Sequence, residues 1–166
     1  MAGLPDAEEL CGQLARELKA QVKASTAMVG IHTGGAWLAE RLHAALGVQE
    51  PLGLLDIAFY RDDYAKQGLA KDPKRSRIPF DVEGRDLLLV DDVLHTGRTV
   101  RAALNELFDY GRPASIALVV LAERGGRQLP ICAQFAGARV EVPAGMRLRL
   151  KRDGKGKLSL ELERGA

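Results

Sequence analysis

The sequence predicts an α/β protein with a mainly parallel central sheet and helices on both of its faces. Apolar runs at residues 27–31, 87–90 and 115–121 are continuous rather than alternating, which is typical of strands covered on both faces. Segments with helical periodicity separate these runs, and such alternation indicates a parallel sheet. The 166 residues contain no repeat and no linker, so we expect residues 1–166 to form a single domain.

The N-terminal third is predicted to hold a helix, a strand and a second helix. Asp6 is suited to cap the first helix, with Glu9 three residues later. The buried face of this helix is marked by an apolar residue at every fourth position: Leu10, Leu14, Leu18 and Val22. Residues 27–31 form the first strand, and a glycine loop at 32–35 leads into a helix that ends at Gly47.

The middle of the chain is predicted to hold a second strand at residues 52–60, followed by a long surface loop. The loop, at about residues 62–78, is rich in Lys and Arg and has neither helical nor strand periodicity. Unstructured loops of more than about a dozen residues in a compact domain often cover active sites, so we expect a mobile cover here. Residues 78–80 are expected to return as an edge strand.

The C-terminal half is predicted to continue the alternation and then to change character. A helix at residues 100–110 ends at Gly111, and the strand at 115–121 follows. From Leu129 onward the pattern indicates short β segments. Residues 147–151 and 157–163 flank an Asp-Gly-Lys-Gly turn and are predicted to form a hairpin.

Composition excludes several functional classes. The net charge is +2, from 24 Lys and Arg against 22 Asp and Glu, which is too weak alone to indicate nucleic-acid binding. The two cysteines, Cys11 and Cys132, have no spacing that indicates a disulfide or a zinc site. No apolar run approaches the roughly 18 residues of a membrane span, and no secretion signal is evident. We therefore expect a cytoplasmic protein with no membrane partner.

The most informative stretch is residues 87–99, where an apolar run ends in Asp91 and Asp92 and a short loop opens a helix. Free N–H groups at a helix start favour a phosphate, and paired carboxylates accept hydrogen bonds from sugar hydroxyls or help hold a divalent cation. The stretch lacks the spacing of a Walker A loop and of GxGxxG. An acidic strand end that only caps the next helix would explain one aspartate but not two. A phosphorylated sugar is the predicted ligand.

The apolar run, the two aspartates and the Thr-Gly-Arg-Thr sequence at 96–99 resemble the binding loop for phosphoribosyl pyrophosphate (PRPP) in type I phosphoribosyltransferases. Four further segments resemble the bifunctional members of that family, which are pyrimidine-operon regulators and uracil phosphoribosyltransferases: residues 29–35, 60–63, 111–113 and 124–131. The resemblance extends from about Asp6 to the C-terminal strands. It implies the type I phosphoribosyltransferase fold, with a small C-terminal β hood at about residues 129–146.

The resemblance also implies roles for individual residues. Asp91 and Asp92 would bind the ribose hydroxyls, with Mg²⁺ nearby on the diphosphate. The 5′-phosphate would be held by one continuous loop: Val93, Leu94, His95, Thr96, Gly97, Arg98 and Thr99. The pyrophosphate loop would consist of His32, Thr33, Gly34 and Gly35. Arg61 would reach the diphosphate, and the nucleotide or base would be approached by Arg124, Arg127 and Val140.

The implied reaction converts uracil and PRPP into UMP and pyrophosphate. UMP would also be the ligand through which a homo-oligomer regulates pyrimidine-biosynthesis genes by binding their leader mRNA. Two alternatives stay open from the sequence. One is a regulator with weak or no transferase activity, and the other is a phosphoribosyltransferase for another base.

One departure from the family pattern bears on catalysis. Gly34 stands where the family commonly has an arginine, and His32 where a lysine is frequent. An arginine there would clamp the diphosphate with a fixed fork of donors. We expect its absence to lower transferase activity rather than nucleotide binding. Backbone N–H groups of the glycine loop, Arg61 or Lys66 are the candidates to hold pyrophosphate instead.

Overall fold

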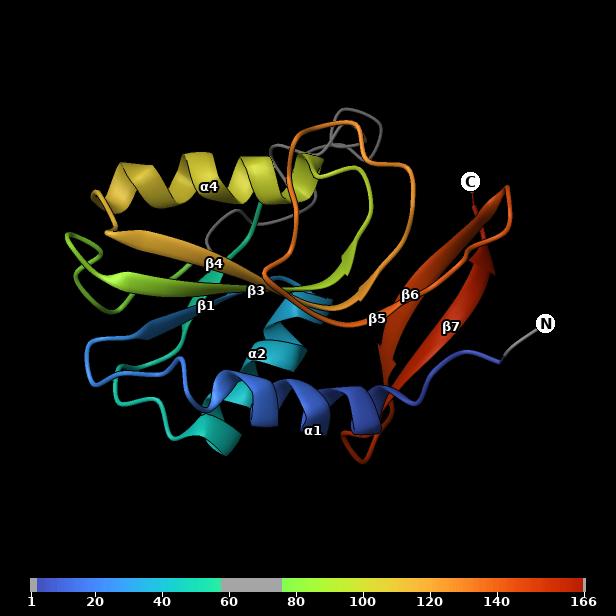
Figure 1. Ribbon diagram of the computed structural model, residues 1–166, viewed down its shortest axis with the longest axis horizontal. Helices are drawn as coiled ribbons and strands as arrows, with labels where there is room; N and C mark the ends of the chain where they lie inside the picture. The colour runs from blue at the N-terminus through green and yellow to red at the C-terminus, as the bar shows by residue number, and fades with distance from the viewer. Residues whose placement is uncertain (1–2, 58–75, 166) are drawn as a thin grey trace.

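A five-stranded parallel sheet forms the centre of the computed structural model, which describes residues 3–57 and 76–165 (Figure 1). Its strands lie in the order β2 (Gly53–Leu55), β1 (Ala27–Ile31), β3 (Asp86–Leu94), β4 (Ser115–Glu123) and β5 (Phe135–Arg139). Each strand runs parallel to its neighbours. The predicted class, an α/β protein with a mainly parallel sheet, is confirmed.

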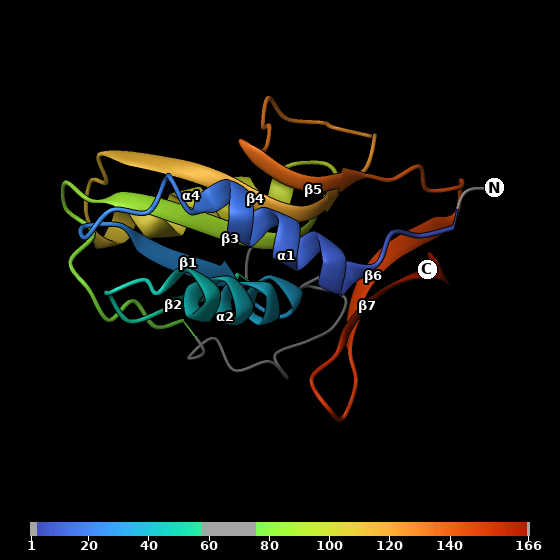
Figure 2. The same ribbon diagram turned by 60° about the horizontal axis from the view of Figure 1, so that its bottom comes forward.

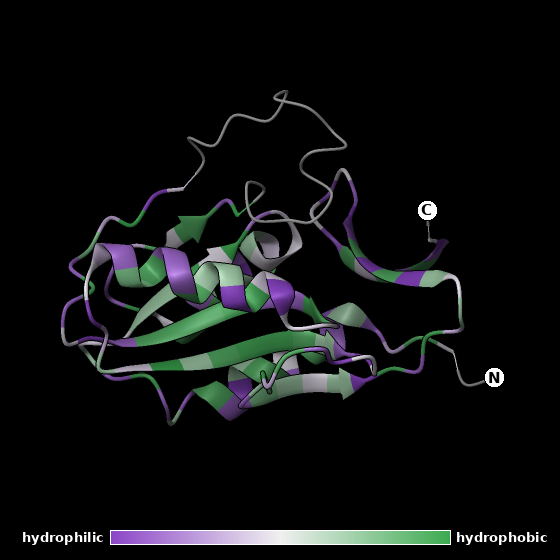
Figure 3. Ribbon diagram, turned by 90° about the horizontal axis from the view of Figure 1, so that it is seen from above, coloured by the Kyte–Doolittle hydropathy of each residue, from purple (hydrophilic) through white to green (hydrophobic). Residues whose placement is uncertain are grey.

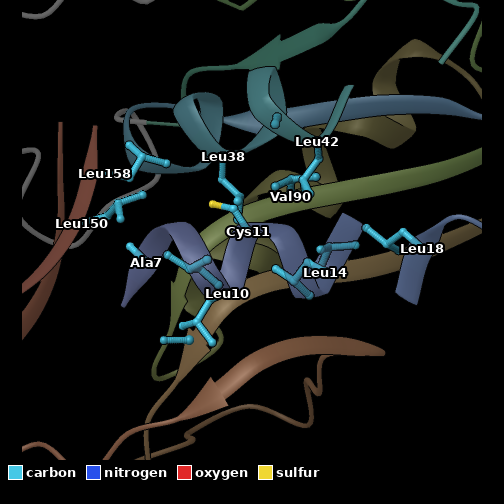
Figure 4. Packing of buried hydrophobic residues seen from close by; sticks show 14 of the residues in the cluster. Ala7, Leu10, Cys11, Leu14, Leu18, Leu38, Leu42, Val90, Leu150 and Leu158 are labelled. Carbon is cyan, nitrogen blue, oxygen red and sulfur yellow. The ribbon is translucent and has the colours of Figure 1, made fainter. Parts of the chain in front are cut away.

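Helices cover both faces of this sheet, as the continuous apolar runs required. α1 (Ala7–Leu18) and α2 (Gly34–Leu46) pack on one face and α4 (Arg98–Tyr110) on the other (Figures 1 and 2). Leu14 of α1 and Leu38 of α2 both belong to the first of two apolar clusters (Figure 4). Apolar residues concentrate in the central strands (Figure 3), and all five residues of β1 are buried.

The caps predicted for α1 and α2 are confirmed, but the predicted end of α1 is not. The Asp6 carboxylate accepts hydrogen bonds from the N–H groups of Glu8 and Glu9, which confirms it as the cap of α1. Gly47 ends α2 with φ of 61°, a left-handed conformation that suits glycine. The predicted continuation of α1 to Val22 is wrong: a turn follows Leu18, because the chain must reverse to enter β1.

The C-terminal hairpin is confirmed as a separate antiparallel sheet of β6 (Met146–Arg152) and β7 (Leu158–Arg164). Figures 1 and 2 place it beyond the carboxyl ends of the central strands. Its buried face belongs to the same apolar cluster as α1 and α2 and consists of four leucines: Leu148, Leu150, Leu158 and Leu160. The Arg152 guanidinium lies 4.8 Å from the centre of the Trp37 ring on α2, so Trp37 helps to dock the hairpin.

Several predicted boundaries need correction. The strand predicted at 52–60 is limited to β2 within the described residues, and residues 78–80 form no edge strand there. Arg77 instead makes one antiparallel bridge to Leu54. The predicted mobile loop at 62–78 lies outside the described residues up to position 75. Part of the stretch expected as a hood, Phe135–Arg139, is the edge strand β5 of the central sheet, because it pairs with β4.

No helix within residues 3–57 and 76–165 combines the length and the apolar character that crossing a bilayer requires.

Candidate active site

The sequence-predicted site segments meet where the order of the sheet reverses. From β1 the chain continues to β2 on one side, whereas β3 leads to β4 and β5 on the other. Open α/β sheets bind ligands at the carboxyl ends of the strands beside such a point. The loop at 32–35 follows β1, the loop at 95–97 follows β3, and the loop at 124–131 follows β4. All three therefore open at the same edge of the sheet (Figure 1).

Two helices begin at this edge without a hydrogen bond from the side chain of the cap residue itself, although at α4 Thr96 Oγ1 accepts a hydrogen bond from the Arg98 N–H at 3.2 Å. The cap residue of α2 is Thr33 and that of α4 is Gly97, and neither makes a side-chain hydrogen bond to its helix. In α1, by contrast, the Asp6 carboxylate occupies two of the N–H groups. Uncapped helix starts leave N–H groups and the positive end of the dipole for an anion. The edge therefore suits a phosphate at each of two places.

The loop after β1 lies directly against the end of β3. A Cβ atom built on Gly35 would lie 2.7 Å from the Val90 carbonyl oxygen and 2.9 Å from the Asp91 Cα. A Cβ on Gly34 would overlap the Asp92 carboxylate, at 2.7 Å from its Cγ. Glycine at both positions is what allows this approach. The peptide bond between His32 and Thr33 is cis.

The acid pair belongs to β3 itself. Asp91 is buried, with 5% of its surface exposed, and Asp92 is half-buried. Asp91 Oδ1 accepts a hydrogen bond from the Asp92 N–H at 2.8 Å, and Asp92 Oδ1 accepts one from the Val93 N–H at 2.8 Å. The strand continues to Leu94. The expected continuous loop from 93 to 99 is thus corrected: its first two residues are strand, and α4 begins at Arg98 rather than at 100.

The loop after β4 supports the loop after β3 through hydrogen bonds. The backbone N–H groups of Gln128 and Leu129 donate to the Thr96 carbonyl oxygen at 2.9 and 3.2 Å. Arg98 Nε donates to Gln128 Oε1 at 2.9 Å, and Arg127 Nη1 donates to the His95 carbonyl oxygen. Sequence reasoning missed Gln128. Its position directly after the basic Arg127, in a loop at a strand's carboxyl end, was the available signal.

The electrostatics of these loops favour a neutral histidine beside two cations. Burial lowers the pKa of His95, and the positive charges of Arg124 and Arg127 lower this pKa further. Arg124 is held at the start of β6, where its Nη1 donates to the Met146 carbonyl oxygen at 3.1 Å. The Arg124 Nε is buried and has no hydrogen-bond partner among the residues that the structure describes.

Not every predicted residue meets the site in the same way. The Val140 side chain is 7% exposed and lies in the apolar cluster with α1, and its N–H donates to the Glu123 carbonyl oxygen. The Val140 side chain is therefore part of the apolar core. Arg61 and Lys66 lie outside the described residues.

The carboxylates at this edge fit a magnesium ion that takes most of its ligands from water and from a bound phosphorylated substrate. Across residues 3–57 and 76–165, no group of three or more His, Cys, Asp or Glu side chains is placed to hold a metal. Mg²⁺ commonly uses one or two carboxylates, water and substrate phosphates. Asp91 and Asp92 match that smaller requirement, so the residues present fit the ion.

Comparison with known proteins identifies the relatives of this chain. A sequence profile for the phosphoribosyl transferase domain matches residues 4–140. The "Bifunctional protein PyrR" of Pseudomonas fluorescens is 47% identical over 164 residues, which cover 96% of each chain. The protein of that name from Ralstonia nicotianae is 48% identical over 155 residues, or 91% of this chain and 88% of the other. A hypoxanthine phosphoribosyltransferase from Staphylococcus aureus has a similar fold, with a TM-score of 0.65 and 20% identity over 82% of this chain and 73% of that one.

Proposed function

The chain belongs to the phosphoribosyltransferase family, among the PyrR proteins, and we propose that it joins uracil to PRPP and regulates pyrimidine-biosynthesis genes in response to UMP. The observation that carries this proposal is the convergence at one sheet edge of a carboxylate pair and two helix starts whose cap residues make no side-chain hydrogen bond. A ribose carrying phosphates at C1 and C5 presents the complementary groups: hydroxyls between two anions.

The proposed roles follow that geometry. Asp91 and Asp92 face the ribose hydroxyls, because both lie between the two helix starts. The start of α4, with Thr96 and Thr99, receives the 5′-phosphate, and the 32–35 loop at the start of α2 receives the diphosphate. Arg61 is proposed to reach the diphosphate from outside the described residues.

The reaction asks for little covalent participation by the protein. The bond between C1 of the ribose and the diphosphate oxygen breaks, the bond between C1 and uracil N1 forms, and the N1 proton passes to solvent. Most of the rate acceleration comes from holding the two reactants in the reactive orientation and from stabilising the charges that develop as the diphosphate leaves C1. Mg²⁺ would neutralise charge on the leaving diphosphate. Asp92, the more exposed aspartate, is the residue to hold that ion, directly or through water.

The base is proposed to be a pyrimidine that Arg124 and Arg127 approach. Uracil has two carbonyl oxygens that need donors, and the buried Arg124 Nε is a donor without a partner among the described residues. An apolar replacement of Arg124 should therefore weaken the binding of uracil or UMP more than the binding of PRPP. A competition assay with uracil, cytosine, hypoxanthine and guanine tests this choice, and turnover of a purine in preference to uracil would overturn it.

The regulatory role is proposed to involve leader mRNA and a homo-oligomer in the cytoplasm. A single chain offers limited positive charge for RNA phosphates: on the hairpin, Glu163 pairs with both Arg149 and Lys151. Arg16, Lys19 and Lys23 are exposed near α1, and assembly of several copies would gather such charges on one surface. A gel shift on the pyrimidine-operon leader with and without UMP tests this role. RNA binding that does not change when UMP is added would contradict the regulatory role.

The enzymatic role is tested by supplying uracil, PRPP and Mg²⁺ and following UMP and pyrophosphate. We expect the two products in equal amounts, a marked loss of turnover in Asp92→Asn, and little change in Asp86→Asn. Asp86 is a matched control because it lies at the opposite end of β3, where it accepts a hydrogen bond from Ser115. PRPP binding without turnover would favour the regulator with no transferase activity, and failure to bind either PRPP or UMP would overturn the whole proposal.

A further inference from the structure

The loop after β3 turns two successive carbonyl groups toward the loop after β4. The His95 carbonyl oxygen accepts a hydrogen bond from Arg127 Nη1. The Thr96 carbonyl oxygen accepts two, from the backbone N–H groups of Gln128 at 2.9 Å and Leu129 at 3.2 Å. Of these three bonds, the one from Arg127 comes from a side chain, so it is the bond that a substitution removes.

These bonds also fix the direction of two N–H groups. A trans peptide unit is planar, so its C=O and N–H groups point in opposite directions. The His95 carbonyl shares its peptide unit with the Thr96 N–H, and the Thr96 carbonyl shares its unit with the Gly97 N–H. Both N–H groups are therefore turned away from the loop after β4. Neither donates a hydrogen bond within the part of the chain that the structure describes, so both are donors for an anion at the start of α4.

Arg127 is itself held by the end of β4. Its Nη2 lies 3.9 Å from Glu123 Oε2, and the two side chains are only 27% and 26% exposed. The backbone beside it passes close to the His95 ring, because a Cβ atom on Gly126 would lie 2.8 Å from His95 Nε2. Both terminal nitrogens of the Arg127 guanidinium thus have partners within the protein.

The neighbouring Arg124 is directed elsewhere. Its Nη1 donates to the Met146 carbonyl oxygen at the start of the hairpin. Its buried Nε, which has no partner among the described residues, is the donor proposed for the base. The two arginines that flank the base therefore serve different parts of the nucleotide.

We propose that Arg127 is a positioning residue for the 5′-phosphate: by holding the His95 carbonyl, it directs the Thr96 N–H toward that phosphate. This inference deepens the proposed function, because it rests on the phosphate site placed there at the start of α4. Its consequence is selective. Loss of the Arg127 hydrogen bond weakens ligands that carry a 5′-phosphate and spares ligands that lack one.

Calorimetric titration of Arg127→Met with UMP and with uridine tests this selectivity. Methionine keeps an unbranched side chain and removes the donors. We expect the UMP affinity to fall at least about tenfold and the uridine affinity to change less than about threefold. Equal weakening of both ligands would overturn the inference, because Arg127 would then act on the base or on the whole fold. An unchanged UMP affinity would overturn it as well.

Arg112→Met is the matched control for the lost positive charge. Arg112 is exposed and precedes β4, at the opposite end of the sheet. Its contact with the Glu83 carboxylate uses the backbone N–H, which the substitution keeps. We expect both affinities to stay within about twofold of the parent. The same selective loss of UMP in Arg112→Met would overturn the inference, because net charge alone would then explain the effect.

Steady-state kinetics separate the two substrates in the same way. PRPP carries the 5′-phosphate and uracil does not. In Arg127→Met the KM of PRPP should rise at least about fivefold, whereas the KM of uracil should change less than about twofold. A rise confined to the KM of uracil would place Arg127 on the base and overturn the inference.

Amide hydrogen exchange needs no ligand and keeps the inference separate from the proposed function. The Gln128 N–H, which donates to the Thr96 carbonyl, should exchange at least about tenfold faster in Arg127→Met than in the parent, and at an unchanged rate in Arg112→Met. Unchanged exchange in Arg127→Met would overturn the inference. A parent that binds UMP and uridine equally contradicts the proposed phosphate site, but exchange still decides whether Arg127 holds the loop.

Discussion

The two loops on either side of the acid pair are built in opposite ways. The loop at 32–35 is held by the close approach of glycine backbone to β3, where Gly35 has no space for a further atom. The loop at 95–97 is held by hydrogen bonds from Arg127 and Gln128, which come from another loop. The first loop is therefore sensitive to atoms that are added, and the second to donors and acceptors that are removed.

The largest effect is expected from an added methyl group in the first loop. In Gly35→Ala the new Cβ would overlap the Val90 carbonyl oxygen and the Asp91 Cα, which are backbone atoms that cannot rotate away. Overpacking of this kind costs about 1–3 kcal/mol and occasionally more, and we expect the upper end. Urea unfolding measures the loss. Gly154→Ala serves as the control and should stay within about 0.5 kcal/mol of the parent; similar losses in the two variants would contradict the difference between the loops.

A smaller effect is expected from truncation in the second loop. Gln128→Ala removes the acceptor of the Arg98 Nε–H but leaves the two backbone bonds to Thr96. A single exposed hydrogen bond contributes about 1 kcal/mol, so we expect that loss in urea unfolding and a several-fold weaker UMP affinity. Gln49→Ala, at an exposed position before β2, is the matched control. A Gln128→Ala variant as unstable as Gly35→Ala would show that the second loop is no more tolerant than the first.

The smallest effect is expected in the pH dependence of the unfolding free energy. It arises from His95 in the second loop. Burial and the charges of Arg124 and Arg127 lower the pKa of His95 in the folded chain below its ordinary value of 6.5. A neutral His95 therefore stabilises the fold fully above pH 6.5, and this stabilisation is lost as the pH falls through the lowered folded pKa.

The difference in unfolding free energy between the parent and His95→Gln isolates this contribution. We expect the parent to lose more stability than His95→Gln as the pH falls below 6.5, the ordinary histidine pKa. Parallel pH profiles would show that the folded pKa of His95 is not lowered. Titration of the His95 ring by NMR gives the same answer directly.

Elements with strong local patterns were predictable, and those fixed by distant contacts were not. The continuous apolar run of β1 and the turn glycines of the hairpin suffice to predict both elements. Phe135–Arg139 was not recognised as a sheet strand, because an edge strand is only half-buried and this one is rich in alanine and glycine. The extension of β3 past its two aspartates was missed because polar residues at a strand end resemble a loop.

The same distinction holds within the site. Asp91 and Asp92 were predicted from their place after an apolar run, and the structure brings them to the two glycine-bearing helix starts. The contact between Gly34 and Asp92 joins positions that are 58 residues apart, so no local pattern reports it. Gln128 meets Arg98 across 30 residues, so its place in the loop after β4 gave a local signal for the site but none for this partner.

Calorimetric titration of the parent chain with UMP and with uridine tests the proposed nucleotide site most directly. The two ligands differ only by the phosphate that the start of α4 is proposed to bind. We predict that UMP binds at least about 100-fold more tightly than uridine, a difference of about 2.7 kcal/mol, and that Asp92→Asn weakens both ligands. Equal affinities for UMP and uridine would contradict a phosphate site at the start of α4.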